Sequence, residues 1–381
     1  MRFLLTLSTA LGVLGLLPAE QANGCPPGQQ RSLRNSIDSS AVILYGWVKN
    51  SQGEGAQGTT DFAITAILKS PPAFSGKQEV RIPRAIPVGD PQSPQRMLVF
   101  AEEYKGKLDY TQGIPVSPAF VEYFQGFLTI DQKNTTAVLR YCWPFMEHSD
   151  PDILEDALRE FRSASMEELL EIGKELSPER LRSWLRDERI SPPRKMLYGL
   201  LLGCCGDASD ACLLRELVVS QWTRGSSAFE PLLGSIMLNP RDGWAQLLAV
   251  AEDPSREFMP RYDTLRAVRF FHNLRPEVVP ATDRLAVIRH LIEQSDMCDL
   301  PIEDLRRWGN WSLTGAVLSK LSATETPLPI VRRAIIRYAL CCPEEQAREL
   351  IREVERKDPE LIKDSRELLR RETDEQNAQK Q

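Results

Sequence analysis

Residues 199–217, GLLLGCCGDASDACLLREL, contain two apolar helical patterns separated by a short polar turn. Leu200, Leu201 and Cys204 fall on one face of the first pattern, because residues three and four apart lie on the same side of a helix. Gly206 favours the end of the first helix, and Asp207 is suited to cap the second. Helices joined by so short a turn are antiparallel neighbours. The stretch therefore predicts a helical hairpin.

The same alternation recurs along the second half of the chain. Apolar helical patterns end at Cys204, Leu238, His272, Trp308 and Cys341, at intervals of 34, 34, 36 and 33 residues, and each interval contains a second helical pattern. A period near 34 with two helices per unit is typical of an α-solenoid, in which each hairpin stacks on its neighbours. The alternative is an irregular helical bundle whose helix lengths coincide. We expect an α-helical repeat domain at residues 149–372 and a disordered tail at 373–381.

The first half of the chain has short β-like patterns instead. Alternating and β-branched residues predict strands at 41–49, 61–69, 79–83, 96–104, 124–130 and 137–143, with a helix or loop over 115–124. Strands this short and numerous suit a small closed or partly open barrel, because closure removes exposed edges. The expected fold class is therefore α+β: a β-barrel domain at 25–148 followed by the helical array.

The N-terminus predicts export. Residues 1–24 contain Arg2, an apolar run from Phe3 to Leu17 and then a polar stretch, which is the layout of a secretory signal peptide. The run is shorter than the roughly 20 residues that span a membrane, so we expect no integral span in the mature chain. We expect a periplasmic or extracellular protein that begins at Cys25. A lipid anchor at Cys25 and an uncleaved N-terminal anchor are the alternatives.

Composition and motifs argue against several function classes. Charged residues make up 26% of the 381 residues and the net charge is −6, whereas nucleic-acid-binding domains carry a basic excess. We expect no nucleic-acid partner. The chain has no Gly-x-Ser-x-Gly, His-Glu-x-x-His, P-loop or Gly-x-Gly-x-x-Gly motif. We therefore expect a protein that is not an enzyme and that uses no cofactor and no metal.

His148 is the strongest candidate for chemistry among the three histidines. It stands beside several carboxylates, namely Glu147, Asp150, Asp152, Glu155 and Asp156. This cluster is compatible with a cation site or with an unrecognised hydrolase. The other interpretation is a helix whose first turn carries acids, because the positive end of the helix dipole favours them.

Three of the eight cysteines lie close together in the opening stretch. Cys204, Cys205 and Cys212 fall within nine positions. An exported protein favours disulfides over metal sites, and Cys-x-x-Cys spacing is absent. Two interpretations remain open: a disulfide across the hairpin that joins Cys212 to Cys205 or to Cys204, or three buried free thiols.

Arginines recur at comparable places in successive helices. The six that stand out are Arg266, Arg269, Arg306, Arg307, Arg333 and Arg337. If the helices stack as a solenoid, these side chains form a binding ridge for an acidic protein or an envelope polymer. The alternative is a solvated flank of each helix, paired with neighbouring acids.

Several stretches carry a resemblance to known proteins. The segments SSAVILYGWV (39–48), TDFAITAILKS (60–70) and LRYC (139–142), after Cys25, resemble the barrel of netrin and of tissue inhibitors of metalloproteinases, which has an oligonucleotide-binding (OB) fold. The helical half resembles HEAT and armadillo repeats. Together the two halves resemble a group of exported bacterial proteins, and this resemblance implies no particular activity.

The resemblance to the inhibitors implies a specific alternative function. In that family an N-terminal cysteine presents its amine and carbonyl to the protease zinc, and Cys25 is placed to do the same. The inhibitors have a second cysteine close behind the first, whereas here Cys142 is the only other cysteine of the domain. A Cys25–Cys142 disulfide is the other interpretation. The function expected from the sequence is an exported, non-catalytic binding or scaffolding protein of the bacterial envelope.

Overall fold

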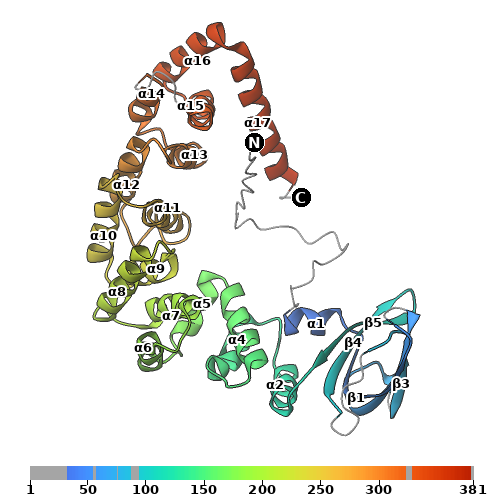
Figure 1. Ribbon diagram of the computed structural model, residues 1–381. Coiled ribbons are helices and arrows are strands. Elements are labelled where there is room, and N and C mark those ends of the chain that lie inside the picture. Colours follow the sequence, from blue (N-terminus) through green and yellow to red (C-terminus); the bar gives the residue numbers. More distant parts are fainter. Residues whose placement is uncertain (1–31, 55–56, 75, 87–93, 323–327, 379–381) are drawn as a thin grey trace, which may run out of the picture. The chain divides into compact units, whose positions relative to one another are not determined.

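The computed structural model describes residues 32–54, 57–74, 76–86, 94–322 and 328–378. The chain separates into two compact units, one covering Gln30–Leu291 and the other containing Ile292–Gln381. The first unit holds an antiparallel sheet and helices up to α12, and the second holds the helices that follow (Figure 1). The predicted signal peptide and Cys25 lie outside the described residues.

The sheet is built from β1 (Val42–Gln52), β2 (Thr59–Lys69), β3 (Glu79–Ile82), β4 (Arg96–Tyr104) and β5 (Lys107–Pro115). The strand order is β3-β2-β1-β4-β5, and every neighbouring pair is antiparallel. At Gly46 the strands come so close that a Cβ atom would lie 1.9 Å from the carbonyl oxygen of Ala63. Only glycine permits this approach, which coincides with a register shift in the β1–β2 pair.

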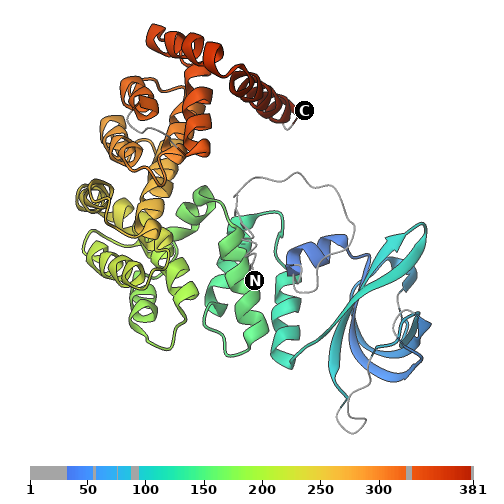
Figure 2. The same ribbon diagram turned by 45° about the horizontal axis from the view of Figure 1, so that its top comes forward.

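Both faces of the sheet are buried. Alternate residues point to opposite sides of a strand, so Ile43 and Leu98 join a core with the helices, while Leu44 and Val99 join a second core. The second core also contains residues of the edge strands β3 and β5. The first face is covered by α1 (Leu33–Ser39) and α2 (Pro118–Leu128), which lie beside the sheet in both views (Figures 1 and 2).

Two of the six predicted strands are wrong. Residues 124–130 fall largely in α2, and 137–143 fall largely in α3 (Thr135–Cys142). Each helix has a local start signal: the side chain of Ser117 accepts from the backbone N–H of Phe120, and that of Asn134 accepts from Ala137. The two predictions failed because short apolar runs do not distinguish a strand from a buried helix. The sequence analysis also missed one strand, β5, which follows β4 through a tight turn.

The remaining helices of the first unit follow without further strands. Short 3₁₀ turns lie at Pro72–Phe74 and Trp143–Phe145. The α-helices are α4 (Pro151–Ser163), α5 (Met166–Gly173), α6 (Pro178–Arg186), α7 (Pro192–Cys205), α8 (Asp210–Thr223), α9 (Phe229–Leu238), α10 (Pro240–Glu252), α11 (Phe258–Asn273) and α12 (Ala281–Glu293).

The helix ends predicted from the sequence are confirmed. Helix α7 ends at Cys205 before Gly206, α9 ends at Leu238, and α11 ends at Asn273. In the second unit α13 ends at Trp308, and Gly309 adopts the left-handed conformation with φ of 62°. Glycine and asparagine–proline signals are local, so they determine where a helix ends before any tertiary contact forms.

Helices α7 and α9 pack at unusually close range. A Cβ atom on Gly203 would lie 2.3 Å from the Cα of Gly234, and one on Gly199 would lie 2.9 Å from the side chain of Pro231. The three glycines therefore bring the two backbones together.

The sheet and these helices share one interior, because the first core contains buried residues from Leu33 to Leu214. The domain limit expected at residue 148 stays a prediction.

The second unit consists of α13 (Asp299–Trp308), α14 (Thr314–Ser322), α15 (Pro329–Cys341), α16 (Glu345–Lys357) and α17 (Pro359–Ala378). Helix α15 contacts each of the other four. Helix α17 continues to Ala378, whereas the sequence predicts disorder from residue 373. Within the described ranges, no helix has the length and apolar character needed to cross a membrane.

Candidate functional site: a pocket between the sheet and α4

The first unit contains a cavity of about 320 Å³ between the sheet and three helices. Helix α1 contributes Leu33 and Ser36, and α2 contributes Phe120. The strands and α4 contribute the remaining lining residues, which are Phe100, Gln112, Ile114, Pro115, Asp152, Glu155, Asp156 and Arg159. The cavity is thus mainly apolar on the side of the sheet, where Gln112 is the one polar lining residue among those described, and charged on the side of α4.

The start of α4 determines which charged residues face the cavity. Asp150 caps the helix, because its carboxylate accepts from the backbone N–H groups of Asp152 at 3.0 Å and Ile153 at 3.4 Å. Asp152, Asp156 and Arg159 then follow at spacings of four and three residues. Such residues lie on one face of a helix, so the sequence around the cap directs this charged face into the pocket.

Asp156 is the deepest charged group of the pocket, with 4% of its surface exposed. Its carboxylate accepts from the hydroxyl of Tyr123 at 2.9 Å and from the backbone N–H of Leu33 at 3.3 Å. Burial raises the pKa of the Asp156 carboxyl, and the bond from Tyr123 opposes that rise. The Tyr123 hydroxyl also lies 3.5 Å from the thiol of Cys142, whose pKa is raised by burial.

Glu160 is the second buried carboxylate of α4, one turn after Asp156. Arg34 of α1 forms an ion pair with it at 2.8 Å, and the Glu160 side chain is only 5% exposed. Burial raises the pKa of Glu160, and the charge of Arg34 opposes the rise. Two buried carboxylates of α4 therefore hold α1 against the pocket, one through the backbone of Leu33 and one through Arg34.

The structure separates His148 from this pocket. Its Nδ1 accepts from the backbone N–H of Asp150 at 3.1 Å, and its ring lies 5.9 Å from that of Phe145. Of the acids beside it in the sequence, three line the cavity, whereas Asp150 caps α4 and accepts a short hydrogen bond from Ser117. Among the described residues, no group of three histidine, cysteine or acidic side chains has the arrangement of a metal site.

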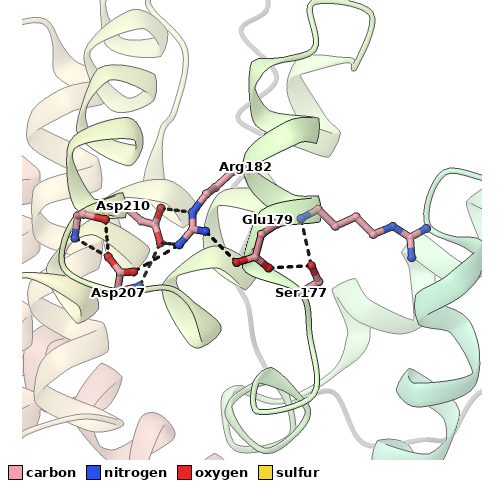
Figure 3. A network of polar contacts seen from close by, with 7 residues as sticks. Ser177, Glu179, Arg182, Asp207 and Asp210 are labelled. Carbon is pink, nitrogen blue, oxygen red and sulfur yellow. Dashed lines mark hydrogen bonds and ion pairs between the residues drawn. The ribbon is translucent and has the colours of Figure 1, made fainter.

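The predicted hairpin corner between α7 and α8 is held by one arginine. Arg182 of α6 donates to both carboxylate oxygens of Asp210, at 2.6 and 2.8 Å, and also to Glu179 at 3.2 Å (Figure 3). Asp210 in turn accepts from the backbone N–H of Asp207 at 3.0 Å. The hydrogen bond from Arg182 lowers the pKa of Asp210. These contacts fasten the turn after Cys205 to α6.

The cysteines of this corner are free thiols in the structure. Burial raises the pKa of Cys204 and of Cys205 to about 12, whereas Cys212 is exposed. The Cys205–Cys212 disulfide stays a prediction. The Cys25–Cys142 disulfide also stays one, because Cys25 lies outside the described residues. Cys142 itself is buried beside Tyr123.

Most of the six arginines expected to form a ridge have acidic partners. Arg266 pairs with Asp263 at 3.3 Å and lies 3.8 Å from the centre of the Phe229 ring. In the second unit Arg337 pairs with Glu303 at 2.5 Å. Arg306 and Arg307 pair with Glu372, whereas Arg333 is exposed and Arg269 also has a polar or electrostatic interaction. Such ion pairs are what the alternative to a binding ridge expects, namely a solvated flank of each helix whose arginines pair with neighbouring acids.

Sequence reasoning identified the acids of the pocket but not the pocket. Asp156 and Glu160 fall on the buried face of α4 together with Ile153, Ala157 and Phe161. An acid on the apolar face of a helix is the signal that would have singled them out. Of the other walls, β5 was missed and α1 had no prediction, whereas the strand at 96–104 and a helix or loop over 115–124 were predicted. Comparison of the chain with family models, curated proteins and solved structures gives no match.

Proposed function

We propose that the protein is an exported, non-catalytic binding or scaffolding protein of the bacterial envelope that contacts its partners through its helices. The observation that carries this proposal is the packing order of the helices. In the first unit α3, α5, α7, α9 and α11 each contact the next member of that series, and in the second α13, α15 and α17 do the same. Contact between alternate helices is what a stack of helical hairpins requires.

The intervening helices support the same interpretation. Helix α8 packs on α7 and α9, and α10 packs on α9 and α11, so each second helix of a hairpin bridges two first helices. A stack of this kind leaves a row of helix faces exposed along its length, and repeat proteins use such rows to bind extended partners. We propose that HEAT-like repeats of this type form the binding part of the chain.

The sheet supports the proposal of an OB-like barrel. The order β3-β2-β1-β4-β5 is the order of a five-stranded barrel opened between β3 and β5. Ile82 of β3 and Tyr110 of β5 join the same core as the central strands, which favours a sheet that curls around that core. Export rests on the signal peptide predicted at residues 1–24.

The test is site-directed photocrosslinking of the intact protein in living bacteria. A photoreactive phenylalanine analogue is placed at Val219 of α8, which is 53% exposed, and at Tyr104 of β4, which is 65% exposed. We expect discrete crosslinked species from position 219, and none from position 104, in the envelope fraction. Crosslinks from position 104 alone, or none from position 219, would contradict binding through the helices.

A further inference from the structure

We propose that the pocket between the sheet and α4 binds a small organic ammonium ion with an aromatic body. The inference concerns a different surface from the helical array, and neither proposal depends on the other. It rests on three properties of the pocket: its size, its apolar side and the arrangement of charge on α4.

The size and the apolar side determine the body of the ligand. A cavity of about 320 Å³ is at the lower end of the range for small-molecule sites, which suits one ring with a short chain. Phe100 is 1% exposed and Phe120 is 4% exposed, and both line the cavity together with Ile114. Aromatic side chains at the wall of a cavity favour an aromatic body, and their faces also attract cations.

The charge on α4 determines the head group. Three carboxylates and one guanidinium line the cavity. Glu155 pairs with Arg162 at 3.0 Å, and Arg159 is close enough to Asp156 to oppose the rise of its pKa. The Asp152 carboxylate is exposed at the rim of the cavity, where water solvates it, and no donor from another described residue pairs with it. An ammonium group supplies such donors and balances the excess negative charge, whereas a carboxylate ligand meets repulsion.

Asp156 gives the pocket a carboxyl group in a fixed position. Only 4% of its surface is exposed, and hydrogen bonds from Tyr123 and from the backbone of Leu33 fix its position from two sides. A carboxylate fixed in a water-poor site interacts more strongly with an incoming cation than one on the surface does. A bound ammonium ion also favours the charged form of Asp156, so we expect affinity to rise as the pH increases through the range in which this buried carboxyl group ionises, and to level off above it.

The test compares three ligands that differ only in their head group, using calorimetry with the full-length mature protein. The probes are 2-phenylethylammonium, 2-phenylethanol and 3-phenylpropionate. We expect the ammonium probe to bind at least about ten-fold more tightly than the alcohol, and the carboxylate probe not to bind. Equal affinity for the first two, preference for the anion, or no binding of the ammonium probe at millimolar concentration would each overturn the proposal.

Variants locate the binding site. Asp152→Asn combined with Glu155→Gln removes exposed charges from the rim, and we expect it to weaken binding of 2-phenylethylammonium several-fold. Asp38→Asn is the matched control, because Asp38 is an exposed acid of α1 that does not line the cavity. Ser36→Leu fills the cavity and should abolish binding. Gln112→Trp obstructs it from β5 and replaces Ser36→Leu if that variant does not fold. Unchanged affinity in a folded obstructed variant would overturn the assignment.

A lysine side chain carries the same ammonium group on a longer aliphatic stem. We expect N-acetyl-lysine methylamide to bind more weakly than 2-phenylethylammonium, because its stem makes less contact with Phe100 and Phe120. Tighter binding of the lysine probe would contradict the aromatic body that we propose.

Discussion

The carboxylate of Asp263 on α11 accepts a hydrogen bond from the indole nitrogen of Trp222 on α8, at 3.0 Å and with no exposed surface on the aspartate. The same carboxylate accepts from the hydroxyl of Ser227 and from the backbone N–H of Ala228, each at 2.7 Å, and Arg266 pairs with it. One buried aspartate therefore joins the end of α8 and the start of α9 to α11.

Replacing this aspartate should destabilise the first unit strongly. Asp263→Ala leaves several buried donors without an acceptor and separates Arg266 from its partner, so we expect a loss of at least about 3 kcal/mol in the free energy of unfolding. Asp263→Asn keeps the volume and one acceptor, and should cost less. Urea unfolding followed by circular dichroism measures both. Asp283→Ala is the control, because Asp283 is exposed on α12 and its loss should cost less than about 1 kcal/mol.

The space around each glycine predicts opposite effects for two substitutions, one at the close contact of α7 and α9 and one on the open surface of α14. Gly203→Ala places a Cβ atom 2.3 Å from the backbone of Gly234, so we expect a loss of roughly 1–3 kcal/mol from overpacking. Gly315→Ala meets no atom within 4 Å on the exposed surface of α14, and should stabilise that helix by up to about 1 kcal/mol. Amide hydrogen exchange reports both locally. Protection of α7 and α9 that is unchanged in Gly203→Ala would contradict the packing argument.

The contact between Arg182 and Asp210 predicts a dependence of stability on pH. The pKa of Asp210 is lowered in the folded protein by the hydrogen bond from Arg182, so this contact stabilises the fold above the ordinary carboxyl pKa of about 4 and is lost as the pH falls through the lowered value. We expect Arg182→Gln to be less stable than the wild type at pH 7, with the difference shrinking below about pH 4. Unfolding in urea at a series of pH values measures it.

An exposed arginine–aspartate pair provides the control for that experiment. Arg189 donates to Asp187 at 2.7 Å, and its side chain is 90% exposed. Exposed pairs contribute little to stability, because water solvates both charges and salt screens them. The hydrogen bond from Arg189 lowers the pKa of Asp187, but water screens this exposed pair, so Arg189→Gln should cost less stability at pH 7 than Arg182→Gln does. An equal effect of the two substitutions would contradict the role assigned to the hairpin corner.

The buried carboxyl of Asp156 predicts the opposite dependence on pH. Because burial raises its pKa, the folded state holds its proton more tightly than the unfolded state does. Its contribution to stability is present below about pH 4, the ordinary aspartate pKa, and is lost as the pH rises through the raised value. Asp156→Asn should reduce the loss of stability between pH 4 and pH 7. Glu160 has a raised pKa as well, so part of the dependence should remain.

The thiols predict an order of chemical modification. In the reduced protein we expect iodoacetamide to label the exposed Cys212 and Cys341 first. It should leave Cys142 and Cys342 unlabelled until the chain unfolds, because both are buried. Burial also raises the pKa of Cys205 to about 12, which keeps its reactive thiolate scarce.

The two predicted disulfides need a separate measurement. Intact mass of the exported protein with and without reductant counts the disulfides. A mass unchanged by reductant would contradict both predicted bridges.

Helix ends and strand limits were predictable to very different degrees. The ends of α7, α9, α13 and α15 follow from glycine, asparagine and proline at the next positions. The segments 124–130 and 137–143 were predicted as strands, because a short run of valine, leucine and aromatic residues suits either structure. Their capping residues, Ser117 and Asn134, carried the decisive signal and lie several residues before the runs themselves.

The sequence by itself determined where the chain turns and which stretches are helical in the second half, because capping and helix termination depend on neighbouring residues. Only the tertiary structure decided which acids matter. Asp156 meets the backbone of Leu33 across 123 residues, and Asp263 meets Trp222 across 41. Such contacts depend on how the helices pack, and a local pattern contains no information about that. For the same reason, the pocket between α4 and the sheet is visible only once the chain has folded.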